Sequence, residues 1–151
     1  MGRDSQRRAV ITGAGGFIGH HLVTYLKSMG YWVRGVDLKK PEYEDTRADE
    51  FITLDLREFE NCNVAVAGVD DVYNLAADMG GIGYISSNHA LLTRNNALIN
   101  SHMLEASRLQ RINKYLYTSS ACVYPSFLQD SADVTPLREE QAIPADPEKG
   151  Y

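Results

Sequence analysis

A glycine-rich turn at residues 12–19, TGAGGFIG, constrains the fold of this 151-residue chain more than any other feature. It follows a short apolar run, AVIT, at residues 9–12, and it precedes apolar residues spaced three or four apart between positions 18 and 29. A strand, a glycine turn and an amphipathic helix in this order favour a parallel sheet, because the helix carries the chain back to start the next parallel strand. Gly30 follows the helical stretch and is predicted to cap its C-terminal end.

Four further segments have the length and the residue types of strands. They are short, rich in β-branched or aromatic residues, and bounded by Gly, Asp or Asn, and they lie at residues 31–36, 51–54, 69–76 and 112–119. A second helical stripe separates the last two of them and is marked by Leu91, Leu98, His102 and Leu109. The sequence therefore predicts an α/β fold, a Rossmann-type doubly wound parallel sheet with helices on both faces.

The composition restricts the classes of molecule that the chain is expected to bind. It carries 15 Lys and Arg against 20 Asp and Glu, a net charge of −5, which disfavours nucleic acid and anionic membranes. No apolar run approaches 18 residues, and we expect a single cytoplasmic domain over residues 1–151 in which Cys62 and Cys122 stay reduced. The stretch 124–150 holds four of the five prolines and is predicted to be a long functional loop.

The glycines of the turn, Gly13, Gly16 and Gly19, are spaced by three residues. This spacing permits a tight turn, lets the main chain approach a pyrophosphate, and allows the following helix to pack close to the sheet. The free N–H groups and the dipole at the helix N-terminus then favour the negative charge of the phosphates. The sequence thus indicates a dinucleotide site, with a simple glycine-rich turn as the plainer alternative.

Asp37 ends the second predicted strand, 18 residues after Gly19. A carboxylate at this position suits the hydroxyl groups of an adenosine ribose and repels a 2′-phosphate, which favours NAD over NADP. Lys39 and Lys40 follow closely and leave the choice between the two cofactors open.

Several motifs together carry a resemblance to a known family. They are TGAGGFIG, Asp37, the pair Asp55–Leu56, NLAA at 74–77, and TSSACVY at 118–124 before a long loop that reaches Tyr151. In this combination the chain resembles, over nearly its whole length, the extended short-chain dehydrogenases/reductases that act on nucleotide sugars. The run NLAADMGGIGYISSNHA at 74–90, with Ser120 and Cys122, is similar to members that epimerise the sugar at C3 and C5.

The resemblance implies an NAD site. The glycine turn would hold the pyrophosphate, Asp37 the ribose, and Asp55 with Leu56 the adenine, while Asn96 would brace the site from the long helix. The full set of implied cofactor-binding residues is Gly13, Gly16, Phe17, Ile18, Gly19, Asp37, Asp55, Leu56, Ala76, Ala77 and Asn96.

The resemblance also implies a nucleotide-sugar site without a metal. Met79, Gly80 and Gly81 would form a loop over the sugar, and Ser120 would hydrogen-bond its C4 oxygen. Tyr151 would take the hydroxyl proton as the tyrosine of a Tyr-x-x-x-Lys pair. The implied catalytic residues are Ser120, Cys122 and Tyr151, and the implied substrate-binding residues are Met79, Gly80, Gly81, Ser120, Ala121 and Cys122.

The implied chemistry accounts for Cys122. Oxidation at C4 gives a ketone that acidifies the hydrogens on C3 and C5, and inverting those carbons needs an acid and a base on opposite ring faces. A cysteine with a pKa of about 8.5 has some thiolate near neutral pH and can serve as one of the two. A cysteine at a strand end is more often a small buried hydrophobe, and this reading applies to Cys62, while the Ser-Ala-Cys context favours catalysis by Cys122.

One departure from the family concerns the C-terminus. The lysine expected four residues after Tyr151 is absent, as are the opposing ring catalyst and the substrate domain. We therefore expect the chain to be the N-terminal part of a protein of about twice the length, which would form a homodimer, and to be inactive alone.

Two alternatives remain open. The first is another enzyme of the family, which epimerises at C3 and C5 and then reduces C4 with NADPH, or a further nucleotide-sugar epimerase or dehydratase. Asp37 and the longer glycine loop argue against the NADPH-dependent enzyme. The second alternative is an isolated NAD-binding module without catalytic activity.

Overall fold

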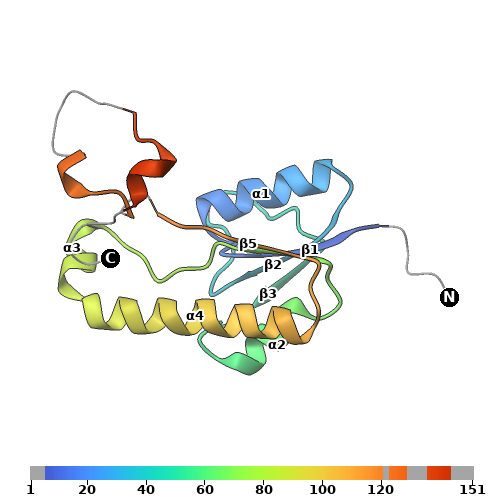
Figure 1. The fold of residues 1–151 in the computed structure, drawn as a ribbon. Coiled ribbons are helices and arrows are strands. Elements are labelled where there is room, and N and C mark those ends of the chain that lie inside the picture. The colour runs from blue at the N-terminus through green and yellow to red at the C-terminus, as the bar shows by residue number, and fades with distance from the viewer. Residues whose placement is uncertain (1–5, 121–122, 129–135, 144–151) are drawn as a thin grey trace. The chain divides into compact units, whose positions relative to one another are not determined.

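A computed structural model describes residues 6–120, 123–128 and 136–143 of the chain (Figure 1). The chain divides into two compact units. The first comprises Met1–Asp78 and Arg94–Tyr117, and the second comprises Met79–Thr93 and Thr118–Tyr151.

The first unit is built on a five-stranded parallel sheet with the strand order β3-β2-β1-β4-β5. The strands are β1 (Arg8–Thr12), β2 (Trp32–Asp37), β3 (Glu50–Thr53), β4 (Asp71–Asn74) and β5 (Lys114–Tyr117). All five predicted strands are therefore present. Because β2 and β4 lie on opposite sides of β1, the order of the strands reverses there, and the predicted Rossmann-type doubly wound sheet is confirmed.

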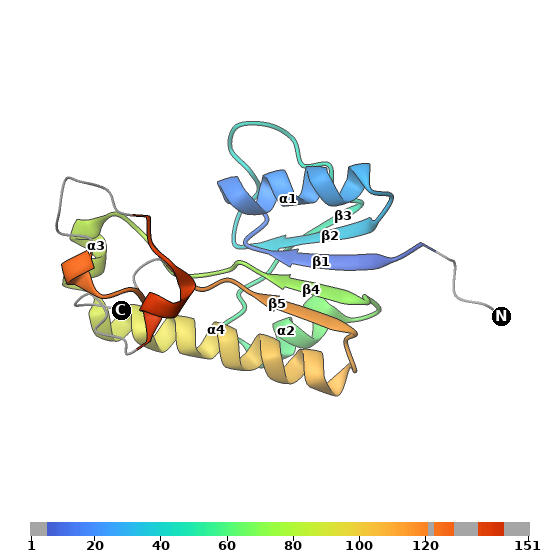
Figure 2. The same cartoon turned by 45° about the horizontal axis from the view of Figure 1, so that its top comes forward.

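Helices cover both faces of this sheet (Figures 1 and 2). Helix α1 (Phe17–Ser28) packs on one face, and α2 (Phe59–Val66) with the part of α4 (His89–Leu109) from Arg94 onward packs on the other. Gly30 follows the C-cap of α1 with φ of +84°, as the sequence predicted. Helix α2 was not predicted, because its eight residues show too short an apolar period to identify a helix.

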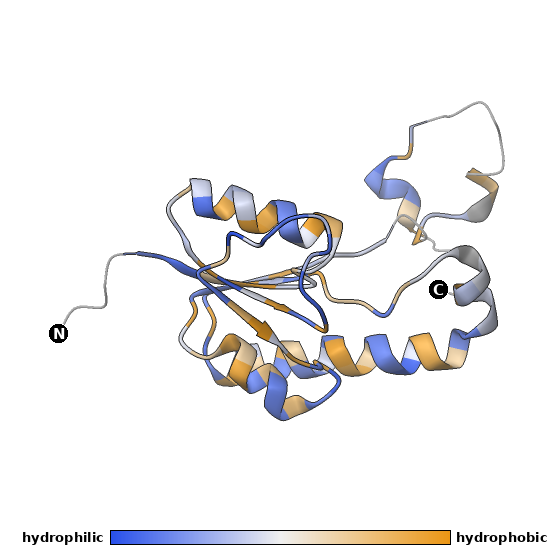
Figure 3. Ribbon diagram, turned by 180° about the vertical axis from the view of Figure 1, so that it is seen from behind, coloured by the Kyte–Doolittle hydropathy of each residue, from blue (hydrophilic) through white to orange (hydrophobic). Residues whose placement is uncertain are grey.

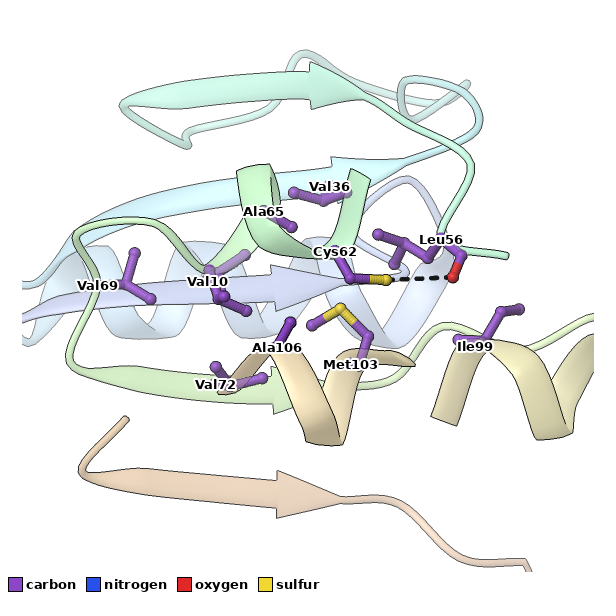
Figure 4. Close-up of a cluster of buried hydrophobic side chains, with 11 residues drawn as sticks. Val10, Val36, Leu56, Cys62, Ala65, Val69, Val72, Ile99, Met103 and Ala106 are labelled. Carbon is purple, nitrogen blue, oxygen red and sulfur yellow. Dashed lines mark hydrogen bonds between the residues drawn. The ribbon is translucent and has the colours of Figure 1, made fainter. Parts of the chain in front are cut away.

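The alternation of side chains along β1 divides the core into two layers. Ala9 and Ile11 pack against Val23 and Leu26 of α1, whereas Val10 points to the opposite layer. That second layer contains α2 and α4, with Cys62 and Met103 lying next to each other beside the sheet (Figure 4). Along α4, hydrophobic and hydrophilic residues alternate with the period of an amphipathic helix (Figure 3).

A buried arginine fixes the C-terminal end of α2. The Arg34 guanidinium, on β2, donates hydrogen bonds to the carbonyl groups of Val64, Ala65 and Ala67 at 3.3, 2.9 and 2.8 Å. It also pairs with Glu50 of β3 at 2.7 Å. A cation at this place satisfies carbonyls that the helix leaves without partners, and it complements the negative end of the helix dipole.

The second unit contains only short elements among its described residues, apart from the start of α4. They are α3 (Ile82–Ser87) and two 3-10 turns, η2 (Ser126–Leu128) and η3 (Glu139–Ala142). The two turns fall within the predicted loop 124–150, of which residues 129–135 and 144–150 lie outside the described part. Within the described ranges of the whole chain, no helix combines the length and apolar character that crossing a membrane requires.

The packing of α4 on the sheet can be tested with two neighbouring residues. Met103 is fully buried and Leu104 is 57% exposed. We expect Met103→Ala to lower the free energy of unfolding by about 2–5 kcal/mol, because it leaves a cavity, and Leu104→Ala to change it by at most about 0.5 kcal/mol. Urea unfolding of both variants measures the difference, and equal losses would contradict this packing.

Candidate functional site

The implied cofactor residues of the first unit gather at the carboxyl ends of four parallel strands. Gly13 follows β1, Asp37 ends β2, Asp55 follows β3, and Ala76 follows β4. The registers place Thr12 beside Val36 and Asn74, and Asp37 beside Thr53, so these ends lie at one edge of the sheet. Ligands of open α/β sheets bind at such an edge, next to the strand where the order reverses.

The glycine turn is closed by main-chain contacts that only glycine permits. Gly13 has φ of +71°, and the Gly16 N–H donates to its carbonyl oxygen at 3.1 Å. A Cβ atom on Gly19 would lie 2.1 Å from the Gly13 oxygen, so a side chain there would push α1 away from the turn. Gly16 caps α1 without a side-chain hydrogen bond, which leaves the first-turn N–H groups available to a phosphate.

Gly15 is a further requirement that the sequence analysis missed. A Cβ atom at this position would lie 2.1 Å from the Lys39 carbonyl oxygen and 3.1 Å from the Asp37 carboxyl carbon. The segment that follows β2 therefore lies directly against the glycine turn. The two successive glycines, Gly15 and Gly16, could have indicated this contact, because a second glycine beside the first suggests that the main chain is approached on more than one side.

Asp37 is held by main-chain donors. Its carboxylate accepts hydrogen bonds from the N–H groups of Gly15 at 2.9 Å, Leu38 at 2.7 Å and Lys39 at 3.3 Å. The side chain is thus fixed beside the glycine turn, where a carboxylate can accept a ribose hydroxyl.

Asp55 is paired with an arginine that the sequence analysis did not identify. Arg57 donates to its two carboxylate oxygens from Nε at 2.9 and 3.1 Å and from Nη2 at 2.6 Å. These hydrogen bonds from Arg57 hold the pKa of Asp55 below its usual value. The neighbouring Leu56 side chain is buried in the core, so any contact of this residue with a base would come from its main chain.

Thr12 organises the start of the segment that follows β4. Its hydroxyl donates to Asn74 Oδ1 at 2.7 Å and accepts hydrogen bonds from the N–H groups of Leu75 and Ala76, both at 3.1 Å. Because these donors bond to a side chain instead of a strand, β4 ends at Asn74, earlier than the predicted position 76. Thr12 thereby sets the course of the main chain at Ala76 and Ala77.

Asn96 braces the same segment two residues further on. Its amide accepts from the Asp78 N–H at 2.7 Å and donates to the Asp78 carbonyl at 3.1 Å. The adjacent Asn95, which is buried, donates to the Asp78 carboxylate at 2.7 Å. Two consecutive side chains of α4 therefore hold the residue that precedes Met79, and the contribution of Asn95 was not predicted.

The implied substrate residues belong to the second unit. Met79, at 51% exposure, and Gly80 precede Gly81, which is the N-cap of α3. Ser120 is exposed. Ala121, Cys122 and Tyr151 lie outside the described residues, so their assigned roles stay predictions.

Cys62 and Tyr115 also carry protons that could in principle be exchanged, but both are unsuited to acid–base catalysis. Burial raises the pKa of the Cys62 thiol to about 12, and the thiol donates to the Leu56 carbonyl at 3.2 Å (Figure 4). Burial likewise raises the pKa of Tyr115 to about 12. Among the described residues, no three His, Cys, Asp or Glu side chains are grouped to hold a metal ion.

Residues 9–151 match the family model of the NAD dependent epimerase/dehydratase family, and the chain belongs to this family. Among curated relatives, it is 48% identical over 146 residues to "GDP-mannose 3,5-epimerase 1" of Oryza sativa subsp. japonica, and 48% identical over 143 residues to "GDP-mannose 3,5-epimerase" of Arabidopsis thaliana. These alignments cover 95% and 93% of the chain. The chain spans 38% of the length of each relative.

Solved structures have the same fold. A UDP-galactose 4-epimerase superposes with a TM-score of 0.73 at 31% identity, over 93% of this chain and 45% of that one. A short-chain dehydrogenase/reductase superfamily protein of Agrobacterium tumefaciens superposes with a TM-score of 0.76 at 23% identity, over 96% of this chain and 40% of that one. Both likenesses agree with the Rossmann-type fold observed here.

The close approach at Gly15 predicts the effect of one methyl group. We expect Gly15→Ala to weaken NAD binding by about 10-fold or more, because the Lys39 carbonyl and Asp37 must move away from the turn. Gly83→Ala is the control, since a Cβ there meets nothing within 4 Å. Calorimetric titration with NAD measures both variants, and an unchanged affinity in Gly15→Ala would show that the Lys39 carbonyl retreats without cost.

The environment of Cys62 predicts its reactivity. With a pKa of about 12, the folded chain holds only about one thiolate in ten thousand at pH 8, because each pH unit below the pKa lowers that fraction tenfold. We expect iodoacetamide to label Cys62 in urea and to leave it unlabelled in the native protein, as read by peptide mass spectrometry. Rapid native labelling would contradict the burial of this thiol.

Proposed function

We propose that this chain provides the cofactor-binding part of an NAD-dependent epimerase that converts GDP-mannose into GDP-L-galactose by inversion at C3 and C5. The observation that carries the proposal is the 48% identity to GDP-mannose 3,5-epimerases of rice and Arabidopsis, extending over 95% and 93% of the chain. An identity of this size over nearly the whole chain favours a shared substrate over a shared fold alone.

The residues at the sheet edge fit NAD. The start of α1, which has no side-chain cap, and the absence of a side chain at Gly16 suit a pyrophosphate, and Asp37 suits an unphosphorylated ribose. A related structure, MoeE5, is described in complex with UDP-glucose and NAD, and it is 29% identical with a TM-score of 0.67. When bound, NAD supplies the reversible removal of hydride from C4 of the sugar.

The first unit would hold and orient the cofactor. Gly13, Gly16, Phe17, Ile18 and Gly19 would surround the pyrophosphate. Asp37 would accept from the ribose, and Asp55 from the adenine amino group, next to the main chain of Leu56. Ala76 and Ala77 would line the cofactor, while Asn96 keeps Asp78 in place through two hydrogen bonds.

The second unit would supply the groups that contact the sugar. Met79, Gly80 and Gly81 would cover the ring, and Ser120, with Ala121 beside it, would donate to the C4 oxygen. Tyr151 would take the C4 hydroxyl proton as the hydride leaves, which gives the 4-keto sugar.

Cys122 would then act on the acidified ring carbons. Its thiolate would remove the proton from a carbon next to the C4 carbonyl, and the electron pair of the broken C–H bond would move into the carbonyl as an enolate. A proton delivered to the opposite ring face by a second group restores the ketone with inverted configuration. Hydride return to C4 with the proton from Tyr151 regenerates the alcohol.

Two further parts of the proposal concern the whole protein. We propose that it is cytoplasmic and that it forms a homodimer. The family resemblance supports the homodimer, and light scattering of the purified protein measures it.

A second candidate is a GDP-L-fucose synthase. The Escherichia coli enzyme of this name is 29% identical over 139 residues, which is 92% of the chain and 39% of that protein. The position of Asp37 disfavours a cofactor with a 2′-phosphate, so this candidate ranks second. A nucleotide-binding module without catalytic activity is the remaining alternative.

Hydrogen exchange at the sugar tests the proposal. The product of the complete reading frame is incubated with GDP-mannose and NAD in deuterated water, and proton NMR follows the signals of H3 and H5. We expect both signals to fade in the parent, and Cys122→Ser to slow the loss by about 100-fold or more, as for removal of an acid–base group.

Cys62→Ala serves as the matched control, because Cys62 is buried in the core and takes no part in the proposed chemistry. It should exchange at the rate of the parent. A folded, NAD-bound parent that exchanges neither proton would exclude 3,5-epimerisation of GDP-mannose and direct attention to other nucleotide sugars.

A further inference from the structure

The connection between β2 and β3, residues 38–49, contains Lys39 and Lys40, the cations that left the choice between NAD and NADP open in the sequence. It passes directly over the glycine turn, because the Lys39 carbonyl lies where a Cβ of Gly15 would be. The Lys39 N–H also donates to Asp37. The partner of the Lys39 ammonium group therefore affects the charge near the proposed adenosine ribose site.

The ammonium of Lys39 is paired with Glu42. Its Nζ lies 2.6 Å from Glu42 Oε1 in an exposed ion pair. The Glu42 hydrogen bond raises the pKa of Lys39, with a smaller contribution from the charge of Asp37, and it lowers the pKa of Glu42. The pair adds little to stability at such exposure, but the charge of Lys39 is attracted by Glu42 and, more weakly, by Asp37.

The residues after Glu42 are fixed to α1. The buried His20 lies with Nε2 2.6 Å from Glu44 Oε1. The ring of Tyr43 meets the rings of His20 and Phe17, with centroids 5.2 and 6.4 Å apart. Glu42 is thus held between two anchored points, the Lys39 carbonyl against Gly15 and residues 43–44 on the first turns of α1.

We propose that Glu42 is a specificity-determining residue that selects against a 2′-phosphate on the adenosine ribose by neutralising Lys39. This inference rests on the proposed function, in which the ribose of NAD binds at Asp37. A 2′-phosphate on a ribose at Asp37, which carries between one and two negative charges, would be repelled by that carboxylate, and the ammonium of Lys39, two residues further along the chain, would already be paired with Glu42.

A double-mutant cycle on Glu42 and Lys39 tests the proposal. Dissociation constants of NAD and NADP are measured by calorimetry at low ionic strength on the product of the complete reading frame, freed of copurified nucleotide. We expect Glu42→Gln to tighten NADP binding about 2- to 5-fold, as for release of an exposed charge, and to leave NAD binding within about 1.5-fold. The gain should disappear in Lys39→Met/Glu42→Gln and shrink as salt is added.

Glu105→Gln is the matched control. It removes the same charge from another exposed pair of the same spacing, Glu105–Arg108 on α4. An equal gain in NADP affinity in this variant would reduce the effect to net charge and overturn the proposal.

Two other outcomes would also overturn it. An unchanged ratio of the two affinities in Glu42→Gln would show that Glu42 does not select, and a gain that persists without Lys39 would assign phosphate binding to another cation such as Lys40. A parent protein that binds neither nucleotide would instead refute the proposed function, and the inference with it.

Discussion

The carbonyl oxygen of Gly13 lies where a side chain at position 19 would have to begin, and this contact between two main-chain segments governs the first unit. It brings α1 close enough to the sheet for Val23 and Leu26 to reach Ala9, Ile11 and Ala14. The same closeness leaves the first turn of α1 facing the carboxyl edge of the sheet. The packing of one core layer and the geometry of the nucleotide site therefore have a single origin, and neither could change without the other.

On the side of β1 that pairs with β4, polar side chains fix the path of the chain where it leaves the sheet. The Thr12 hydroxyl takes over the N–H groups of Leu75 and Ala76, and Asn96 takes both main-chain groups of Asp78. The segment 75–78 is thus held by side chains from two different elements, β1 and α4. These hydrogen bonds fix the path of residues 75–78, which form neither helix nor strand.

The sequence was sufficient for the features that follow from local patterns. The five strands, α1, the capping Gly30 and the placement of Asp37 at the end of β2 all derive from apolar periods and from glycine chemistry within a few residues. Arg34, Thr12 and Asn95 were missed because their partners are distant in the chain. Thr12 and Asn74, for example, are 62 residues apart, and nothing near either residue identifies the other.

The candidate site divides in the same way. The glycines of the turn and Asp37 followed from local patterns, whereas Asp55, Leu56, Ala76, Ala77 and Asn96 came from the family resemblance, and the cofactor roles of all of them stay predictions. Arg57 beside Asp55 and the second asparagine on Asp78 became visible only in three dimensions. The roles given to Ser120, Cys122 and Tyr151 rest on resemblance and stay predictions.

The three N–H groups bound to Asp37 limit how it can receive a ribose. A carboxylate offers about four lone-pair positions, and here Oδ1 accepts from Leu38 and Lys39 while Oδ2 accepts from Gly15. One position on Oδ2 is left. A ribose with two hydroxyl groups could therefore place one on Asp37 without disturbing the turn, and the second would have to share an acceptor or displace an amide. The single free acceptor position favours a hydrogen bond to one ribose hydroxyl over the bidentate contact that a carboxylate without other partners could make.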